Sequence, residues 1–100
     1  MAYDKDAATE LSLYIDNDSY MYNRQKAFVD NVKRKIKAGK YDPSKAGKLW
    51  SYYVEEGAKR YMKEIAGGGS VSSVFNKETR NVLAEEYAEE AYRQILNGRL

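Results

Sequence analysis

The segment from residue 43 to residue 66 constrains the fold more than any other. Asp42 is suited to cap a helix and Pro43 to occupy its first turn, because proline lacks only an N–H that would be unpaired there. Pro43 is the only proline, so nothing interrupts the helix that it starts. At ~100° per residue the apolar side chains fall on one broad stripe, as in a helix that crosses a core. This stripe comprises Ala46, Leu49, Trp50, Tyr53, Val54, Gly57, Ala58, Tyr61 and Ile65.

Gly57 lies within the stripe, where glycine costs about 1 kcal/mol of helix propensity relative to alanine. Close approach by the backbone of another helix would compensate for this cost. We expect the last helix to make that approach through its small residues Ala84, Ala88 and Ala91.

Two helices are predicted before this segment. The first runs from about Asp4 to Tyr14, with apolar residues spaced i, i+4, i+7 and i+8. The segment DNDS, residues 16–19, reads as a turn and an N-cap, because it lacks the glycine and the glutamate of a calcium loop. The second helix continues to about Ala38 and Gly39 ends it. Its inward side comprises Met21, Gln25, Phe28, Val29, Val32 and Ile36.

The last helix is predicted to run from Lys77 to Leu96, with Asn76 as its cap and Gly98 as its stop. The residues expected to face inward are Leu83, Ala84, Tyr87, Ala88, Ala91 and Ile95. The fold class is therefore all-α: a compact bundle of three long helices plus a short N-terminal helix. We expect a single helical domain over residues 1–100, with a flexible Gly/Ser loop at residues 67–73.

The composition argues against most enzyme classes. The chain has no cysteine and no histidine, and so lacks thiolate ligands, the commonest general base near neutral pH and the commonest metal ligand. The acidic run at residues 85–90, EEYAEE, lacks the histidines of helical carboxylate metal sites and reads as a solvated face. We expect no catalytic residues, no cofactor, no metal and no small-molecule substrate. No apolar run is long enough to cross a bilayer and no signal peptide is evident, so we expect no membrane partner and a cytoplasmic location.

Charge is unevenly distributed along the chain. Residues 33–63 carry 10 basic and 3 acidic side chains, although the whole chain has a net charge of only +2. Lysines in the last turns of the second helix are favoured by the helix dipole, but Lys45 and Lys48 lie in the first turns of the third helix, where the dipole disfavours them. At ~100° per residue they continue into Lys59 and Lys63, with Tyr52 between the two pairs.

Two interpretations of this basic surface remain open. It could neutralise phosphates while Tyr52 stacks on a base, which makes a candidate polyanion-binding set of Lys33, Lys37, Lys40, Lys45, Lys48, Tyr52, Lys59 and Lys63. It could instead be a solvated face on which Glu55 and Glu56 pair with Lys59 and Arg60 at i,i+4 spacing.

The chain is rich in tyrosine, with ten tyrosines against two phenylalanines. Because tyrosine joins apolar area to a hydroxyl group, it suits half-buried positions and interfaces. We expect some of Tyr20, Tyr22, Tyr41, Tyr52 and Tyr92 to reach the surface, either because the small core borders water or because they form a protein-binding or self-association surface.

Three segments resemble a group of small uncharacterised helical proteins encoded by tailed bacteriophages. They are LYIDNDSYMYNRQ, GKYDPSKAGKLWSYYVEEGAKRYMKE and FNKETRNVLAEEYAEEAYRQ, which together cover most of the chain from Leu11 onward. The resemblance implies a phage context and the host-cell cytoplasm, and it implies no site residues. The sequence thus favours a non-enzymatic helical protein-interaction module, whose partner is a protein or another copy of itself. The alternative is nucleic-acid binding through the Lys/Tyr side of the third helix.

Overall fold

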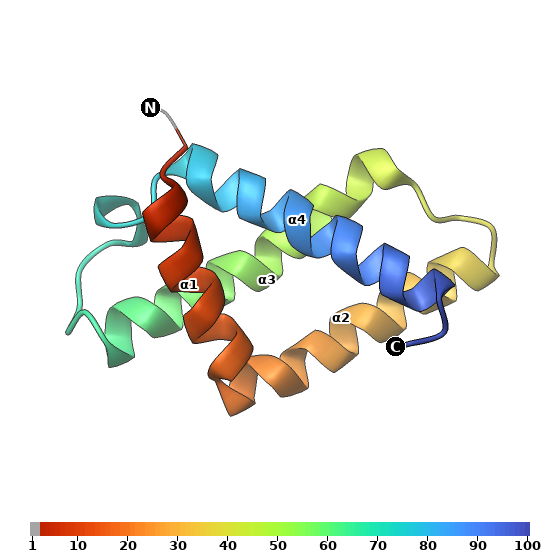
Figure 1. Ribbon diagram of the computed structural model, residues 1–100, viewed down its shortest axis with the longest axis horizontal. Coiled ribbons are helices and arrows are strands. Elements are labelled where there is room, and N and C mark those ends of the chain that lie inside the picture. The colour runs from red at the N-terminus through yellow and green to blue at the C-terminus, as the bar shows by residue number, and fades with distance from the viewer. Residues whose placement is uncertain (1–2) are drawn as a thin grey trace.

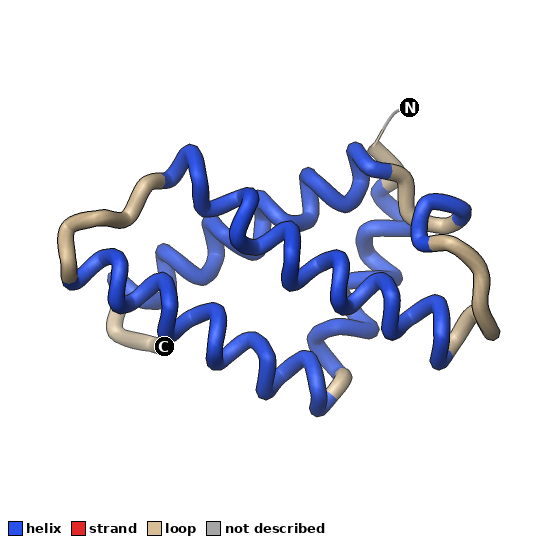
Figure 2. The backbone as a smooth tube through the Cα atoms, turned by 180° about the vertical axis from the view of Figure 1, so that it is seen from behind, coloured by secondary structure: helices blue, strands red, loops and turns tan. Residues whose placement is uncertain are grey.

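The computed structural model describes residues 3–100, which form four α-helices and one short 3-10 helix and contain no strand. α1 spans Lys5–Asn17, α2 Ser19–Lys37, α3 Pro43–Glu64 and α4 Lys77–Leu96, and the 3-10 helix η1, Val71–Ser73, precedes α4. In Figure 1, α1 and α4 lie in front of α2 and α3. Figure 2 shows from behind that the α2–α3 turn and the α3–α4 loop lie at opposite ends of the molecule, which measures 41 × 29 × 18 Å. The predicted compact all-α fold is confirmed.

A polar side chain caps the start of every α-helix. The capping residues are Asp4, Asp18, Asp42 and Asn76, each of which accepts a hydrogen bond from a backbone N–H in the first turn. Gly39 and Gly98 follow the ends of α2 and α4 with φ of 71° and 72°, as predicted for left-handed residues beyond a helix. Local capping chemistry therefore sets most of the helix ends.

The junction of α1 and α2 is tighter than predicted. α1 does not end at Tyr14 but continues to Asn17, so that Asp18 alone separates the two helices. The backbone N–H of Asp18 donates to the carbonyl oxygen of Ile15, while its side chain accepts from the N–H of Met21. One residue thus ends α1 and caps α2. The predicted end of the third helix at Ala66 is also wrong, because α3 ends at Glu64.

The core is built on the apolar stripe of α3. Its buried members are Ala46, Trp50, Tyr53, Val54, Gly57, Ala58 and Tyr61, and they join buried residues from all four helices in one cluster. Leu49 is only partly buried, and Ile65 is 60% exposed rather than part of the stripe. Ile65 does not join the buried stripe because it follows the last helical residue, where the 3.6-residue spacing no longer applies.

Aromatic rings fill the centre of this cluster. The ring of Trp50 lies 5.6 Å from that of Phe28, 5.3 Å from that of Tyr53 and 6.3 Å from that of Tyr87, measured between centroids. The hydroxyl of Tyr53 donates to the backbone oxygen of Met21 at 3.1 Å, so its polar group is satisfied. Burial raises the pKa of the Tyr53 and Tyr87 hydroxyls above the usual value for tyrosine, because the charged phenolate would lose its hydration there.

On α4 the predicted inward side is confirmed, with Leu83, Ala84, Ala88 and Ala91 buried and Tyr87 and Ile95 partly buried. The loop before α4 contains η1 and, after it, Phe75, which is fully buried. The ring centroid of Phe75 lies 5.1 Å from that of Tyr61. Apolar spacing could not predict this anchor, because Phe75 stands outside every helical repeat.

Gly57 is buried, but its neighbour is not the one predicted. A Cβ built there would lie 2.5 Å from Cγ1 and 2.6 Å from Cδ1 of Ile15 on α1. Neither Ala84, Ala88 nor Ala91 of α4 is among the nearest atoms. Gly57 therefore makes room for a side chain of α1 rather than for the backbone of α4.

We expect Gly57→Ala to destabilise the protein by about 1–3 kcal/mol, because Ile15 is fully buried and cannot move aside without strain. Gly47→Ala is the matched control on the same helix. Its Cβ would meet only Cγ of Glu85 at 3.5 Å, an ordinary contact, so the gain of about 1 kcal/mol in helix propensity should appear. Urea denaturation measures both changes, and equal stabilisation by both would contradict the close contact with Ile15.

Candidate functional site

The outer side of α3 carries a row of exposed side chains, Lys45, Lys48, Tyr52, Lys59 and Lys63, here called the Lys/Tyr face. At ~100° per residue it points away from the buried stripe. Tyr52 is 60% exposed at its centre. In residues 3–100 every ion pair is made by an arginine, so none of these lysines forms one. Lys45 does lie near Asp42, whose pKa it helps to lower after the larger effect of hydrogen bonds from Ser44.

The acids beside the Lys/Tyr face do not neutralise it. One of the two interpretations of the sequence paired Glu55 and Glu56 with Lys59 and Arg60 along the helix, and these pairs do not form. Glu55 pairs with Arg80 of α4 instead. Glu56 turns toward α2, where it accepts from Nε of Arg24 at 3.0 Å and from the hydroxyl of Tyr20 at 2.6 Å. The two acids are therefore held by other helices, one on each side of α3.

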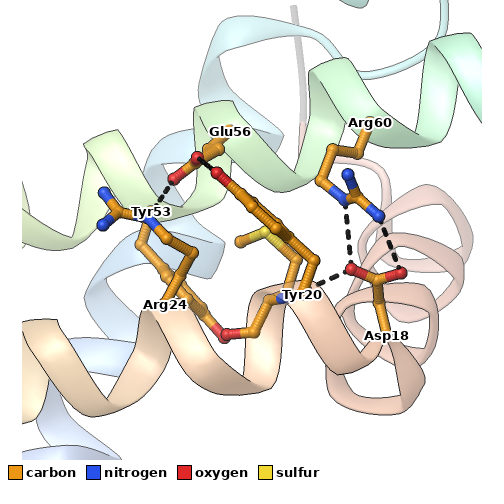
Figure 3. Close-up of polar contacts among 7 residues, drawn as sticks. Asp18, Tyr20, Arg24, Tyr53, Glu56 and Arg60 are labelled. Atoms are coloured by element: carbon orange, nitrogen blue, oxygen red, sulfur yellow. Dashed lines mark hydrogen bonds and ion pairs between the residues drawn. The ribbon is translucent and has the colours of Figure 1, made fainter.

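Arg60 also makes its contact with another helix rather than along α3. Its Nε and one terminal nitrogen each donate to Asp18 at 3.1 Å, a two-point contact between α3 and the α1–α2 junction. Its guanidinium lies over the ring of Tyr20, 4.3 Å from the centroid. Figure 3 shows how these side chains meet between α2 and α3; we call them the Asp18 network, comprising Asp18, Tyr20, Arg24, Glu56 and Arg60.

Both carboxylates of the Asp18 network are stabilised in their ionised form. The hydrogen bond from Arg60 holds the pKa of Asp18 below its usual value, assisted by the N–H of Met21 and opposed by burial. Burial opposes ionisation of Glu56, but hydrogen bonds from Tyr20 and Arg24 outweigh it and also lower the pKa of that carboxyl. The network is thus a structural clamp that stays charged at neutral pH.

The other three predicted lysines lie around the end of α2. Lys40 and Lys45 line one small cavity of about 40 Å³ with Lys35, so the turn brings Lys40 close to the Lys/Tyr face. Lys37 is exposed in the last turn of α2. Lys33 is partly buried and lines a different groove with Tyr22 and Leu100. The structure therefore does not gather the whole predicted set on one surface.

The outer side of α4 is acidic. Glu85, Glu86, Glu89 and Glu90 are exposed, and of these Glu90 pairs with Arg93 at 3.1 Å and accepts from Gln94 at 2.8 Å. Within residues 3–100 no three acid side chains are close enough together to hold a metal ion. None of these glutamates forms an ion pair with the Lys/Tyr face, so the two charged surfaces do not neutralise each other.

Some of five tyrosines were expected to reach the surface, and three of them do: Tyr20 is 43% exposed, Tyr22 56% and Tyr52 60%. Tyr41 and Tyr92 are partly buried instead, because they stack on each other with centroids 4.5 Å apart and planes 6° from parallel. Sequence reasoning missed this stack and the Asp18 network. The sequence shows only that Arg60 lies four residues after Glu56, a spacing that favours the wrong pair.

Comparison with protein-family models, curated proteins and solved structures finds no match for this chain. No helix in the part of the chain that the structure describes is both long and apolar enough to cross a membrane. The function must therefore be argued from the surfaces themselves.

Asp18→Ala should cost more stability than Asp42→Ala, its matched control. Both remove an N-cap worth about 1 kcal/mol, but only Asp18 also accepts two hydrogen bonds from an arginine, which adds about 1.5–3 kcal/mol. Urea denaturation at pH 7 measures the difference. Equal costs would show that the contact with Arg60 adds nothing.

The contribution of Asp18 should also depend on pH. Since its pKa is lower in the folded chain than the usual value of about 3.9, its stabilisation is present above that value and is lost as the pH falls through the folded pKa. Asp18→Asn should therefore flatten the loss of stability below about pH 4. An unchanged acid limb in urea titrations of that variant would contradict this assignment.

Proposed function

We propose that this protein is a non-enzymatic interaction module whose partner is a protein, either a different protein or another copy of the chain itself. The observation that carries the proposal is the state of its charges. Arginines hold the acids on both flanks of α3, and this leaves the lysines of the Lys/Tyr face without an ion pair in residues 3–100. Glu85 and Glu89 on α4 likewise have no basic partner. A chain with two unpaired surfaces of opposite charge is suited to a partner with complementary charges.

Exposed aromatic residues support a protein partner. Tyrosine is enriched at protein interfaces, because it brings a large rigid area at low entropic cost. Tyr52 lies at the centre of the Lys/Tyr face, and Tyr20 is held in place by Glu56 and Arg60. The lack of histidine and cysteine supports a role without catalysis. In line with the resemblance to tailed-phage proteins, we propose that the partner is met in the cytoplasm of an infected cell.

This proposal is tested with tagged protein in a bacterial lysate and, separately, alone at increasing concentration. We expect wild-type protein either to retain a specific protein or to self-associate. Lys48→Gln/Lys59→Gln or Glu85→Gln/Glu89→Gln should weaken the binding at least tenfold, since interfacial charge pairs contribute about 1.5 kcal/mol or more. Lys5→Gln, an exposed lysine of α1, is the control. No captured protein and a monomer at every concentration would refute the proposal.

Nucleic-acid binding is the second candidate, and one specific observation favours it. Lys59 and Lys63 line a groove of about 270 Å³ together with residues 67–69, the three glycines of the loop. A phosphate could approach backbone N–H groups there, while Tyr52 offers its exposed ring to a base. The Lys/Tyr face has no arginine, asparagine or glutamine to read base edges, so we propose binding through phosphates rather than through sequence readout.

A salt titration tests the second candidate. If the four lysines of the Lys/Tyr face each neutralise one phosphate of single-stranded DNA, the plot of log K against log salt should have a slope of about −3. Each Lys→Gln change on this face should reduce the slope by about 0.7, and Lys5→Gln should not change it. Absence of binding to single-stranded DNA in a gel shift at low salt would exclude this function.

A further inference from the structure

A groove separates the start of α3 from the middle of α4. It has a volume of about 420 Å³. Its lining includes the small residues Ala46, Gly47 and Ala88, which leave the groove open. The stacked rings of Tyr41 and Tyr92 also line it. The groove is thus an aromatic and apolar depression rather than a charged surface alone.

Two glutamates complete the lining of this groove. Glu85 and Glu89 stand one turn apart on α4, both exposed and without an ionic partner in residues 3–100. A depression with aromatic walls and unpaired carboxylates fits a group that is both aromatic and cationic, because rings pack on the tyrosines while ammonium groups pair with the acids.

The chain itself carries such a group. On the Lys/Tyr face, Tyr52 projects into solvent between Lys48 and Lys59. Tyr52 lies about 140° around α3 from Gly47, which lines the groove, at ~100° per residue. Ser44, which also lines the groove, lies only about 40° around α3 from Lys48. No ion pair in residues 3–100 joins Lys48 or Lys59 to Glu85 or Glu89, so the two surfaces are left for a second chain to bring together.

We propose that Tyr52, Lys48 and Lys59 of one copy dock in the groove of a second copy, where they contact the Tyr41–Tyr92 stack and the Glu85–Glu89 pair. This inference rests on the proposed function and names its partner as the chain itself. The contact joins two different surfaces, so one copy of a docked pair keeps a free groove and the other keeps a free Lys/Tyr face. Assembly is therefore head to tail. Because the contact is largely ionic, it weakens as salt rises.

Sedimentation velocity of the purified full chain tests the docking. At low salt the weight-average mass of wild-type protein should rise above 11.5 kDa with concentration, and at high salt it should return to 11.5 kDa. Glu85→Gln/Glu89→Gln, the groove variant, should stay monomeric, as should Lys48→Gln/Lys59→Gln, the face variant. Lys5→Gln should behave as wild type. Circular dichroism checks that each variant remains helical.

A mixing experiment identifies which surfaces meet. The groove variant keeps an intact Lys/Tyr face, and the face variant keeps an intact groove. Mixed in equal amounts at low salt, these two monomers should form a 1:1 complex of twice 11.5 kDa and grow no further. Adding Tyr52→Ala to the groove variant should weaken that complex, because the aromatic part of the contact is then lost.

Wild-type protein that stays at 11.5 kDa at low salt would overturn the docking, as would self-association that neither double substitution weakens. Variants that fail to complement each other when mixed would also overturn it. The proposed function fails separately. If wild-type protein does not self-associate but retains a lysate protein that the groove or face variant loses, the docking is refuted and the proposed function stands. If wild-type protein neither self-associates nor retains a lysate protein, both proposals are refuted.

Discussion

Asp18 fixes the relative positions of three helices. Its backbone N–H closes the end of α1, one of its oxygens caps α2 through Met21, and both oxygens accept hydrogen bonds from Arg60 of α3. With α1 and α2 joined at this single residue, Ile15 is directed onto α3 at Gly57, where any larger residue would collide with it. The packing of the core and the clamp at its edge therefore depend on one another.

This clamp also decides which charges remain at the surface. Arginine presents a planar fork that matches a carboxylate at two points, whereas a lysine ammonium is strongly hydrated and gains less from such a contact. Arg24, Arg60 and Arg80 accordingly hold acids between helices, and the lysines of α3 stay in solvent. Had Glu55 and Glu56 paired with two of the four lysines, half of the positive charge of the Lys/Tyr face would be neutralised. Stability and surface charge are thus set by the same contacts.

The elements that the sequence predicted well are those fixed by neighbouring residues. Asp42, Pro43 and Asn76 mark helix starts through their own hydrogen bonding or ring geometry, and apolar spacing locates the stripe of α3. Contacts between helices could not be read in this way. The spacing of Glu56 and Arg60 suits a pair along the helix, yet both residues reach α2 or its junction, because half-buried partners there exclude water. The neighbour of Gly57 and the buried position of Phe75 likewise depend on tertiary packing.

For the candidate surfaces the same distinction holds. Helical geometry alone placed Lys45, Lys48, Tyr52, Lys59 and Lys63 together, and they are together; Lys33 was grouped with them only by closeness in sequence, and it lies apart. The groove beside α4 could not be foreseen, because it arises where residues of α3, α4 and the α2–α3 turn meet. Within residues 3–100 no ion pair joins the lysines of α3 to the glutamates of the groove, because arginines hold the acids that face α3 and the glutamates of α4 point into solvent.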